Sequence, residues 1–150
     1  MAKSIILLAT KEMDKRKFIS RWILVTGIII TLIGIIHVSF TPVMYQQIIN
    51  DETIDETLKD KAPGFAYFFA FCGFAFLYAG LLTIYSSFGL KKSEKWALTL
   101  SISAGLFVAI GGISALAFAK FSNPMIYIMS ISAISNVFLL LIFSGAKNST

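Results

Sequence analysis

The segment that decides the fold is FAYFFAFCGFAFLYAGLLTIYSSF, residues 65–88. It contains no acidic or basic residue, and the charge-free sequence around it reaches from Lys61 to Lys91. A helix needs roughly 20 apolar residues to cross the hydrocarbon core of a bilayer, which is about 30 Å thick. Backbone polar groups inside lipid must be hydrogen-bonded within their own segment. Residues 65–88 are therefore predicted to form a membrane-spanning helix.

Three further stretches of comparable length also lack acidic and basic residues. The composition agrees with this pattern, because 57% of the 150 residues are apolar and only 14% are charged, whereas soluble domains have about 45–50% and about 25%. The sequence therefore predicts an all-α integral membrane protein, an antiparallel up-down-up-down bundle of four transmembrane helices in one membrane domain. The predicted spans are residues 22–40, 65–88, 97–119 and 124–145.

Cysteine and charge counts exclude several classes of function. The single cysteine, Cys72, excludes an intramolecular disulfide and any CxxC redox or zinc motif. No predicted span contains an acidic residue, which argues against ion-coupled transport through a buried carboxylate. The net charge of +5 raises the question of nucleic-acid binding, but the basic residues lie at the ends of the spans, so we expect no nucleic-acid partner.

The positions of Lys and Arg predict the orientation in the membrane. Ten of the 13 lie in the segment 1–21, in the loop 89–96 and in the tail 146–150. Cytoplasmic loops carry an excess of Lys and Arg, so both termini are predicted to be cytoplasmic. Residues 1–21 are a basic segment for which an interfacial helix is one interpretation. We expect no cleaved signal peptide, and a lysine- and isoleucine-rich chain of this kind fits a bacterial inner membrane.

The outer side is predicted to hold a short loop at 120–123 and an acidic loop with short helices at 41–64. In the acidic loop, Pro42 is typical of a helix start, and Thr53 with Glu56 matches a capping box. Two interpretations of the acidic residues remain open, a solvated face or a surface that binds a cation or a basic partner. The spacing required for an EF-hand is missing.

Helix packing in membranes relies on small residues that allow close approach. Each predicted span carries such residues at alternating spacings of three and four. We predict that six glycines lie at helix contacts in a left-handed bundle. They are Gly27, Gly34, Gly73, Gly80, Gly105 and Gly112.

His37 is the first candidate for chemistry, because its side chain titrates near neutral pH and lies near the outer end of the first span. Its functional interpretations are a proton acceptor, a metal or haem ligand, or a hydrogen bond to a ligand. The alternative is an interfacial histidine bonded to a neighbouring group. One histidine alone cannot supply the three or four ligands of a metal site, so no metal site is predicted. Tyr45, Tyr67 and Asn123 are candidate neighbours on the outer side.

Asn136 and Ser132, one turn apart, are the polar candidates in the fourth span. The carboxamide of Asn136 is expected either to form a hydrogen bond to another helix or to contact a ligand. The outer half of the second span is rich in aromatic residues, from Phe65 to Phe76. This pattern fits either a π-lined groove for a flat hydrophobic ligand, such as a sterol, quinone or carotenoid, or a lipid-facing aromatic belt.

Taken together, these features favour a non-enzymatic protein, either an accessory or scaffold subunit or a binder of a lipid-like hydrophobic ligand. The alternative is a membrane enzyme or a homo-oligomeric transporter that uses His37 near the outer face. Membrane lipids are the expected partners, with a protein partner or further copies of the chain as open alternatives. No motif identifies a catalytic residue, a cofactor or one of the known four-span families.

Overall fold

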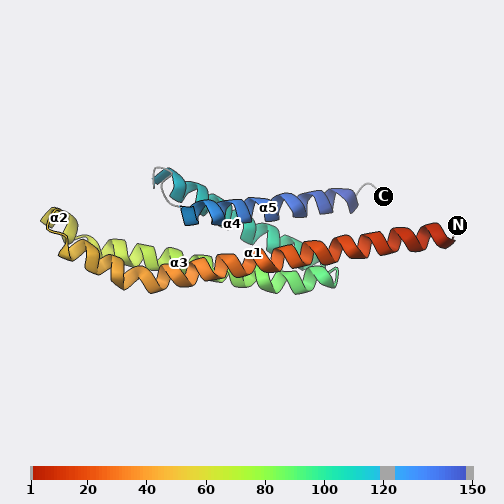
Figure 1. Ribbon diagram of the computed structural model, residues 1–150, viewed down its shortest axis with the longest axis horizontal. Coiled ribbons are helices and arrows are strands. Elements are labelled where there is room, and N and C mark those ends of the chain that lie inside the picture. Colours follow the sequence, from red (N-terminus) through yellow and green to blue (C-terminus); the bar gives the residue numbers. More distant parts are fainter. Residues whose placement is uncertain (1, 119–123, 148–150) are drawn as a thin grey trace.

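The computed structural model describes the backbone of residues 2–118 and 124–147 and the side chains of residues 13–114 and 127–141, and every element in it is a helix. Four long helices follow one another, with one short helix in the first connection (Figure 1). The helices are α1 (Ala2–Asn50), α2 (Glu56–Lys59), α3 (Ala62–Lys91), α4 (Lys95–Phe118) and α5 (Pro124–Lys147).

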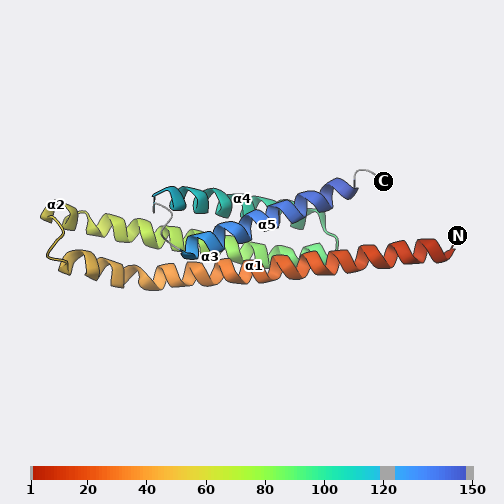
Figure 2. The same cartoon turned by 45° about the horizontal axis from the view of Figure 1, so that its top comes forward.

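Successive long helices run in opposite directions along the molecule, so α5 ends on the side where α1 begins (Figure 1). Helices α1 and α3 lie side by side along most of α3, and α4 and α5 form a second pair beside them (Figure 2). Contacts join α1 to α3, α3 to α4, α4 to α5 and α5 back to α1. The four long helices therefore enclose a common interior.

Within the described residues, three helical segments are long and apolar enough to cross a membrane: Met13–Asn50, Ala62–Lys91 and Lys95–Ser114. This confirms a helical protein that is suited to a membrane. The fourth expected span, 124–145, coincides with α5. Its described side chains cover only Tyr127–Leu141, an apolar stretch shorter than a full span, so the fourth crossing remains a prediction.

Helix α1 continues through Pro42, which contradicts the predicted helix start at that residue. A proline inside a helix removes one backbone hydrogen bond. Membrane helices tolerate this because Ser and Thr side chains can bond freed carbonyl groups. Pro42 frees the carbonyl group of Val38, and the hydroxyl of Thr41 donates to the adjacent carbonyl oxygen, that of His37, at 3.0 Å. The helix extends to Asn50, well into the segment predicted as an outer loop.

The connection between α1 and α3, which was predicted as residues 41–64, spans only residues 51–61, and its short helix α2 begins at a different residue from the one expected. Helix α2 is capped by Asp55, whose carboxylate accepts the backbone N–H of Thr57 at 3.1 Å. The predicted capping box of Thr53 and Glu56 is therefore wrong. Thr53 instead donates its backbone N–H and its hydroxyl to Asp51, at 2.9 and 2.6 Å, because an aspartate readily bonds the chain two residues ahead.

At the other end of α1, the basic segment is part of the same helix rather than a separate one, because α1 begins at Ala2. The guanidinium of Arg16 donates to the hydroxyl of Ser93 in the turn between α3 and α4. The helical residues that precede Arg16 therefore lie beyond this turn, and the first turns of α1 project past the other helices in both views (Figures 1 and 2).

Helices α1 and α3 approach each other backbone to backbone through glycines. A methyl group on Gly34 would lie 2.8 Å from the carbonyl oxygen of Gly73, and one on Gly73 would lie 2.9 Å from the backbone nitrogen of Val38. A methyl group on Gly27 would lie 2.9 Å from the backbone nitrogen of Ile84. Only a residue without a side chain fits at these distances, so this pair of helices is closely packed along its length.

The contact between α4 and α5 also involves glycines, but here they face side chains. A methyl group on Gly105 would lie 2.9 Å from Cγ2 of Val137. Gly112 lies directly against the hydroxyl of Ser130. The structure thus places all six predicted glycines at helix contacts.

The interior is layered. One apolar cluster contains Ile30, Ile33, Phe76, Ala79, Val108, Ala109, Met129 and Ala133. A second, nearer the α3–α4 turn, contains Ile19, Ile23, Leu90, Ala97 and Leu140. Between the two clusters, each long helix carries buried polar residues that are at most 2% exposed: one each on α1, α4 and α5, and three on α3, where Ser86 and Ser87 follow Thr83 toward the α3–α4 turn. We call four of these residues, one from each long helix, the polar layer: Thr26, Thr83, Ser101 and Asn136.

Candidate ligand groove between helices α3 and α4

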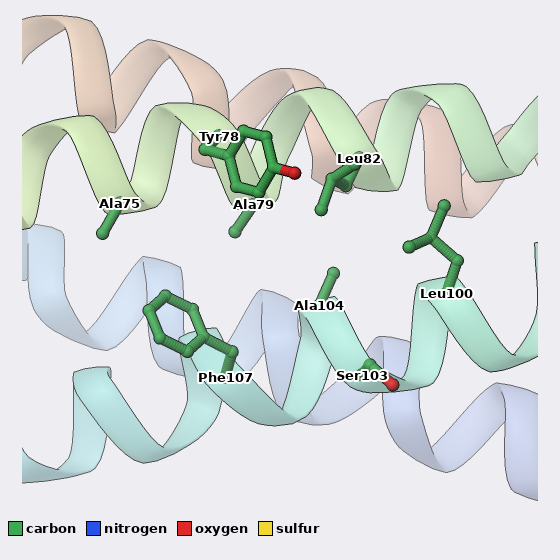
Figure 3. Close-up of a pocket in the computed structure, with 8 residues that line it drawn as sticks. All are labelled: Ala75, Tyr78, Ala79, Leu82, Leu100, Ser103, Ala104 and Phe107. Atoms are coloured by element: carbon green, nitrogen blue, oxygen red, sulfur yellow. The ribbon is translucent and has the colours of Figure 1, made fainter.

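A groove with a volume of about 280 Å³ lies between α3 and α4 (Figure 3). Four lining residues come from each helix, and nearly all of the lining is apolar. The residues are Ala75, Tyr78, Ala79 and Leu82 from α3, and Leu100, Ser103, Ala104 and Phe107 from α4.

Small residues between larger ones create the groove. Ala79 and Ala104 form its floor and are buried, at 3% and 5% exposure. Tyr78 and Phe107 form its rims and are 64% and 54% exposed. Since the methyl groups of the floor cannot fill the space between the two helices, the aromatic rims enclose an open apolar channel (Figure 3).

Two of the lining residues, Tyr78 and Ser103, carry hydroxyl groups, while nearly all of the groove surface itself is carbon. The Tyr78 ring lies beside α3 with its hydroxyl directed toward Leu82 (Figure 3). Among the described residues, no hydrogen bond joins this hydroxyl to another group. An apolar channel with one available phenol can bind a hydrophobic molecule and orient it by one hydrogen bond.

His37, the first predicted candidate, lies between α1 and α3 and not in the groove. Its ring stacks on Phe69 with 4.5 Å between ring centroids and meets the edge of Phe76 at 5.8 Å. Its β-carbon is packed against Gly73. The ring of His37 thus packs against aromatic side chains of α3 and also forms a hydrogen bond with the backbone of Ile33 on its own helix.

The predicted neighbours of His37 are spread out. Tyr67 is 76% exposed on the outer face of α3, and Tyr45 is half-buried near the end of α1. Asn123 lies outside the described residues. Among the described residues, no group of three His, Cys, Asp or Glu side chains is placed to hold a metal ion.

Asn136 belongs to the polar layer and joins α5 to α1. Its carboxamide oxygen accepts a hydrogen bond from the Thr26 hydroxyl at 2.8 Å. One turn earlier on α5, the carbonyl oxygen of Ser132 accepts from Ser135 at 2.8 Å, and the Ser135 hydroxyl accepts the Trp22 indole N–H at 3.3 Å. This part of α5 therefore contacts α1, and neither Asn136 nor Ser132 lines the groove.

The connection between α1 and α3 has a local electrostatic pattern. Two hydrogen bonds from Thr53, first from its hydroxyl and then from its backbone N–H, lower the pKa of the Asp51 carboxyl below its ordinary value. The ammonium group of Lys59 lies 3.0 Å from the carboxylate of Glu56. Asp51 and Glu56 are thus both stabilised by residues of the same connection. Neither carboxylate needs a bound cation or a basic protein to explain its presence.

The groove was missed in the sequence because its residues have no unusual composition. Most aromatic residues in the N-terminal half of α3 point away from the other helices; Phe68, Phe71 and Phe74, for example, are 67%, 60% and 57% exposed. They do not line the groove. The available signal was a tyrosine in the middle of a span with alanines three positions before and one position after it, Ala75 and Ala79.

Comparisons of the chain with protein-family models, with curated proteins and with solved structures found no match. A proposal about function therefore rests on the geometry alone.

Proposed function

We propose that this protein is a four-span helical membrane protein that binds a lipid-like hydrophobic ligand in the groove between α3 and α4. The observation that carries the proposal is the apolar groove in the middle of two helices that are each long enough to cross a membrane. Its volume of about 280 Å³ is just under the range of about 300–1,000 Å³ that encloses a whole drug-sized ligand. The groove suits one ring, or a section of chain, of an elongated molecule.

In the proposed arrangement both termini are cytoplasmic. The contact of Arg16 with Ser93 brings the basic residues of α1 next to those of the α3–α4 turn, Lys91 and Lys92. The acidic connection around α2 lies at the opposite end of the molecule (Figure 1). This separation of charge supports the orientation in which the basic end faces the cytoplasm.

Tyr78 indicates which hydrophobic ligand fits. The other two tyrosines of α3 follow the usual preference for the membrane interface: Tyr67 lies near the outer end, and Tyr85 lies near the inner end, where it stacks on Trp96 at 5.0 Å. Along the helix, Tyr78 is about 16 Å from Tyr67 and about 10 Å from Tyr85. The position of Tyr78 on the helix therefore lies within the hydrocarbon, between these two interfacial tyrosines.

A hydroxyl without a hydrogen bond in an apolar medium costs roughly 2–7 kcal/mol. Phospholipids and sterols keep their oxygen atoms at the membrane surface and present only hydrocarbon at the depth of Tyr78. An uncharged ring that carries a carbonyl oxygen and an apolar tail, as in isoprenoid quinones, places a hydrogen-bond acceptor at that depth. The ligand class that we propose is therefore an isoprenoid quinone, held by Tyr78 and packed against Phe107.

The test is photolabelling of the protein in nanodiscs with a diazirine-bearing alkane, followed by peptide mapping. We expect labelling of the groove segments 75–82 and 100–107 above that of the lipid-facing part of α1 at the same depth. Ala75→Trp narrows the groove and should reduce this labelling, whereas Leu81→Trp, on the exposed side of the same helix, should not. Equal labelling of α1 and the groove would overturn the proposal of a ligand groove.

The ligand class is tested by competition in the same assay. Decylubiquinone should protect the groove at a concentration about three- to tenfold lower than decylbenzene, the effect of one hydrogen bond. Tyr78→Phe should abolish this difference, and Tyr85→Phe, the matched control outside the groove, should retain it. If both competitors protect equally in the unmodified protein, the quinone class is wrong while the groove still binds hydrophobic molecules.

A further inference from the structure

The polar layer contains two polar atoms with no protein partner. Within the described residues, the Asn136 Nδ2 amide and the Ser101 hydroxyl form no hydrogen bond, although both side chains are completely buried. Buried polar groups in proteins are almost always bonded to protein or to ordered water. These two atoms therefore require a hydrogen-bonding partner inside the bundle.

Reversing the orientation of the carboxamide does not remove this requirement. In the present orientation the oxygen of Asn136 accepts from Thr26 at 2.8 Å and the amide nitrogen is unpartnered. In the reversed orientation the nitrogen donates to the Thr26 oxygen, and the Thr26 hydroxyl donates to the carbonyl of Trp22 or Ile23, each at 3.1 Å. The Asn136 oxygen is then the unpartnered atom. Either way, one end of the carboxamide needs a partner.

Ser101 lies at a suitable place to share that partner. A methyl group on Gly105 would lie 3.9 Å from the β-carbon of Asn136, and Ser101 lies four residues before Gly105 on the same face of α4. One helical turn rises about 5.4 Å. The side chains of Asn136 and Ser101 thus begin about one helical turn apart across the α4–α5 contact, so that one oxygen atom with a hydrogen bond of about 2.8 Å to each can lie between them.

We propose that the polar layer binds a water molecule that bridges the amide of Asn136 and the hydroxyl of Ser101. A water molecule serves either orientation of the carboxamide, because it both donates and accepts, whereas a cation would suit only the orientation that leaves the Asn136 oxygen unpartnered. The apolar clusters on both sides separate this water from either end of the bundle. The site is independent of the groove, which lies between α3 and α4 and shares no residue with the layer.

The first test is an NMR measurement on the protein labelled with ¹⁵N-asparagine in a detergent micelle. The side-chain amide of Asn136, assigned by its loss in Asn136→Leu, should show a cross-relaxation peak to water. Ser101→Ala should weaken or remove that peak. A missing water peak in the unmodified protein would overturn the proposal, and so would a shift of the amide signal that depends on the identity of the monovalent cation.

The second test measures whether the two residues are coupled although they form no direct bond. In a double-mutant cycle with Ser101→Ala and Asn136→Leu, the effects on the unfolding equilibrium should differ from additivity by about two- to tenfold. The control cycle uses Ser130→Ala, whose hydroxyl is also unpartnered but lies against Gly112 outside the layer, and should be additive with Asn136→Leu. Additivity in both cycles would contradict a shared water.

Discussion

The replacement Gly34→Ala should weaken the pairing of α1 with α3. The new methyl group would lie 2.8 Å from the carbonyl oxygen of Gly73 and 2.8 Å from the α-carbon of Leu77. Both are backbone atoms of a helix and cannot rotate away, so the two helices must move apart and lose packing along their contact. Overpacking of this kind costs about 1–3 kcal/mol.

Two other glycines are matched controls for the same substitution. A methyl group on Gly64 meets nothing within 4 Å, and one on Gly111 lies 3.5 Å from Cε1 of Phe76, an ordinary contact. Alanine is favoured over glycine inside a helix by up to about 1 kcal/mol. Because Gly34 and Gly111 both lie inside helices, this gain cancels between their variants, and the difference between them measures the clash alone.

The assay is reversible unfolding of each variant in mixed micelles of mild detergent and SDS, followed by tryptophan fluorescence and circular dichroism. Gly34→Ala should unfold more easily than Gly111→Ala by about 1–3 kcal/mol, which is roughly a five- to 150-fold difference in the equilibrium constant. If Gly34→Ala and Gly111→Ala unfold at the same fraction of SDS, α1 and α3 do not meet backbone to backbone and the packing described above is wrong.

Three further predictions concern the interior, the outer loop and the orientation. A double-mutant cycle with Thr26→Val and Asn136→Leu should give a coupling of about 0.6 kcal/mol, the average for hydrogen bonds between membrane helices, and zero coupling would mean that Thr26 bonds only its own helix. In a ¹³C NMR titration, the pKa of Asp51 should lie below its ordinary value of 3.8 and should rise in Thr53→Ala. Because the pKa of Asp51 is lowered in the folded protein, the hydrogen bonds from Thr53 stabilise the fold above pH 3.8, and this contribution is lost as the pH falls through the folded pKa. An equal Asp51 pKa in the unmodified protein and in Thr53→Ala would contradict the hydrogen-bonded turn. In a Cys72→Ala background, Thr53→Cys should react with a membrane-impermeant thiol reagent in intact cells, and reaction only after lysis would reverse the proposed orientation.

The helical content and the packing residues of the pair α1 and α3 could be predicted from the sequence, because both depend on local patterns. Charge-free stretches indicate helices in a membrane, and glycines spaced by three and four residues indicate where two helices approach. Gly34 and Gly73 illustrate this, since the structure places them against the neighbouring helix. The extent of α1 was harder to predict because of Pro42. In water a proline usually lies at the beginning or end of a helix, whereas in a membrane breaking the helix leaves backbone groups without hydrogen bonds and so costs more free energy.

The groove and the partner of Asn136 could not be predicted, because both depend on which helices become neighbours. The alanines at positions 75, 79 and 104 resemble any other small residues of a membrane helix until α3 and α4 are placed side by side. An asparagine within a span predicts a hydrogen bond between helices, but that Thr26 is the partner of Asn136 depends on the relative position of α1 and α5. Spacing within one helix carries no information about this register.

Helix α1 also has a mechanical consequence. Its 49 residues measure about 74 Å at 1.5 Å per residue, more than twice the thickness of a hydrocarbon core. In the proposed orientation this single helix has its basic N-terminal end on the cytoplasmic side of the membrane and its other end, at Asn50, on the opposite side. The close contacts at Gly27, Gly34 and Gly73 hold α3 against α1, and α3 forms one wall of the groove. Helix α1 thereby fixes the position of one wall of the groove along the whole depth of the membrane, although no described residue of α1 lines the groove.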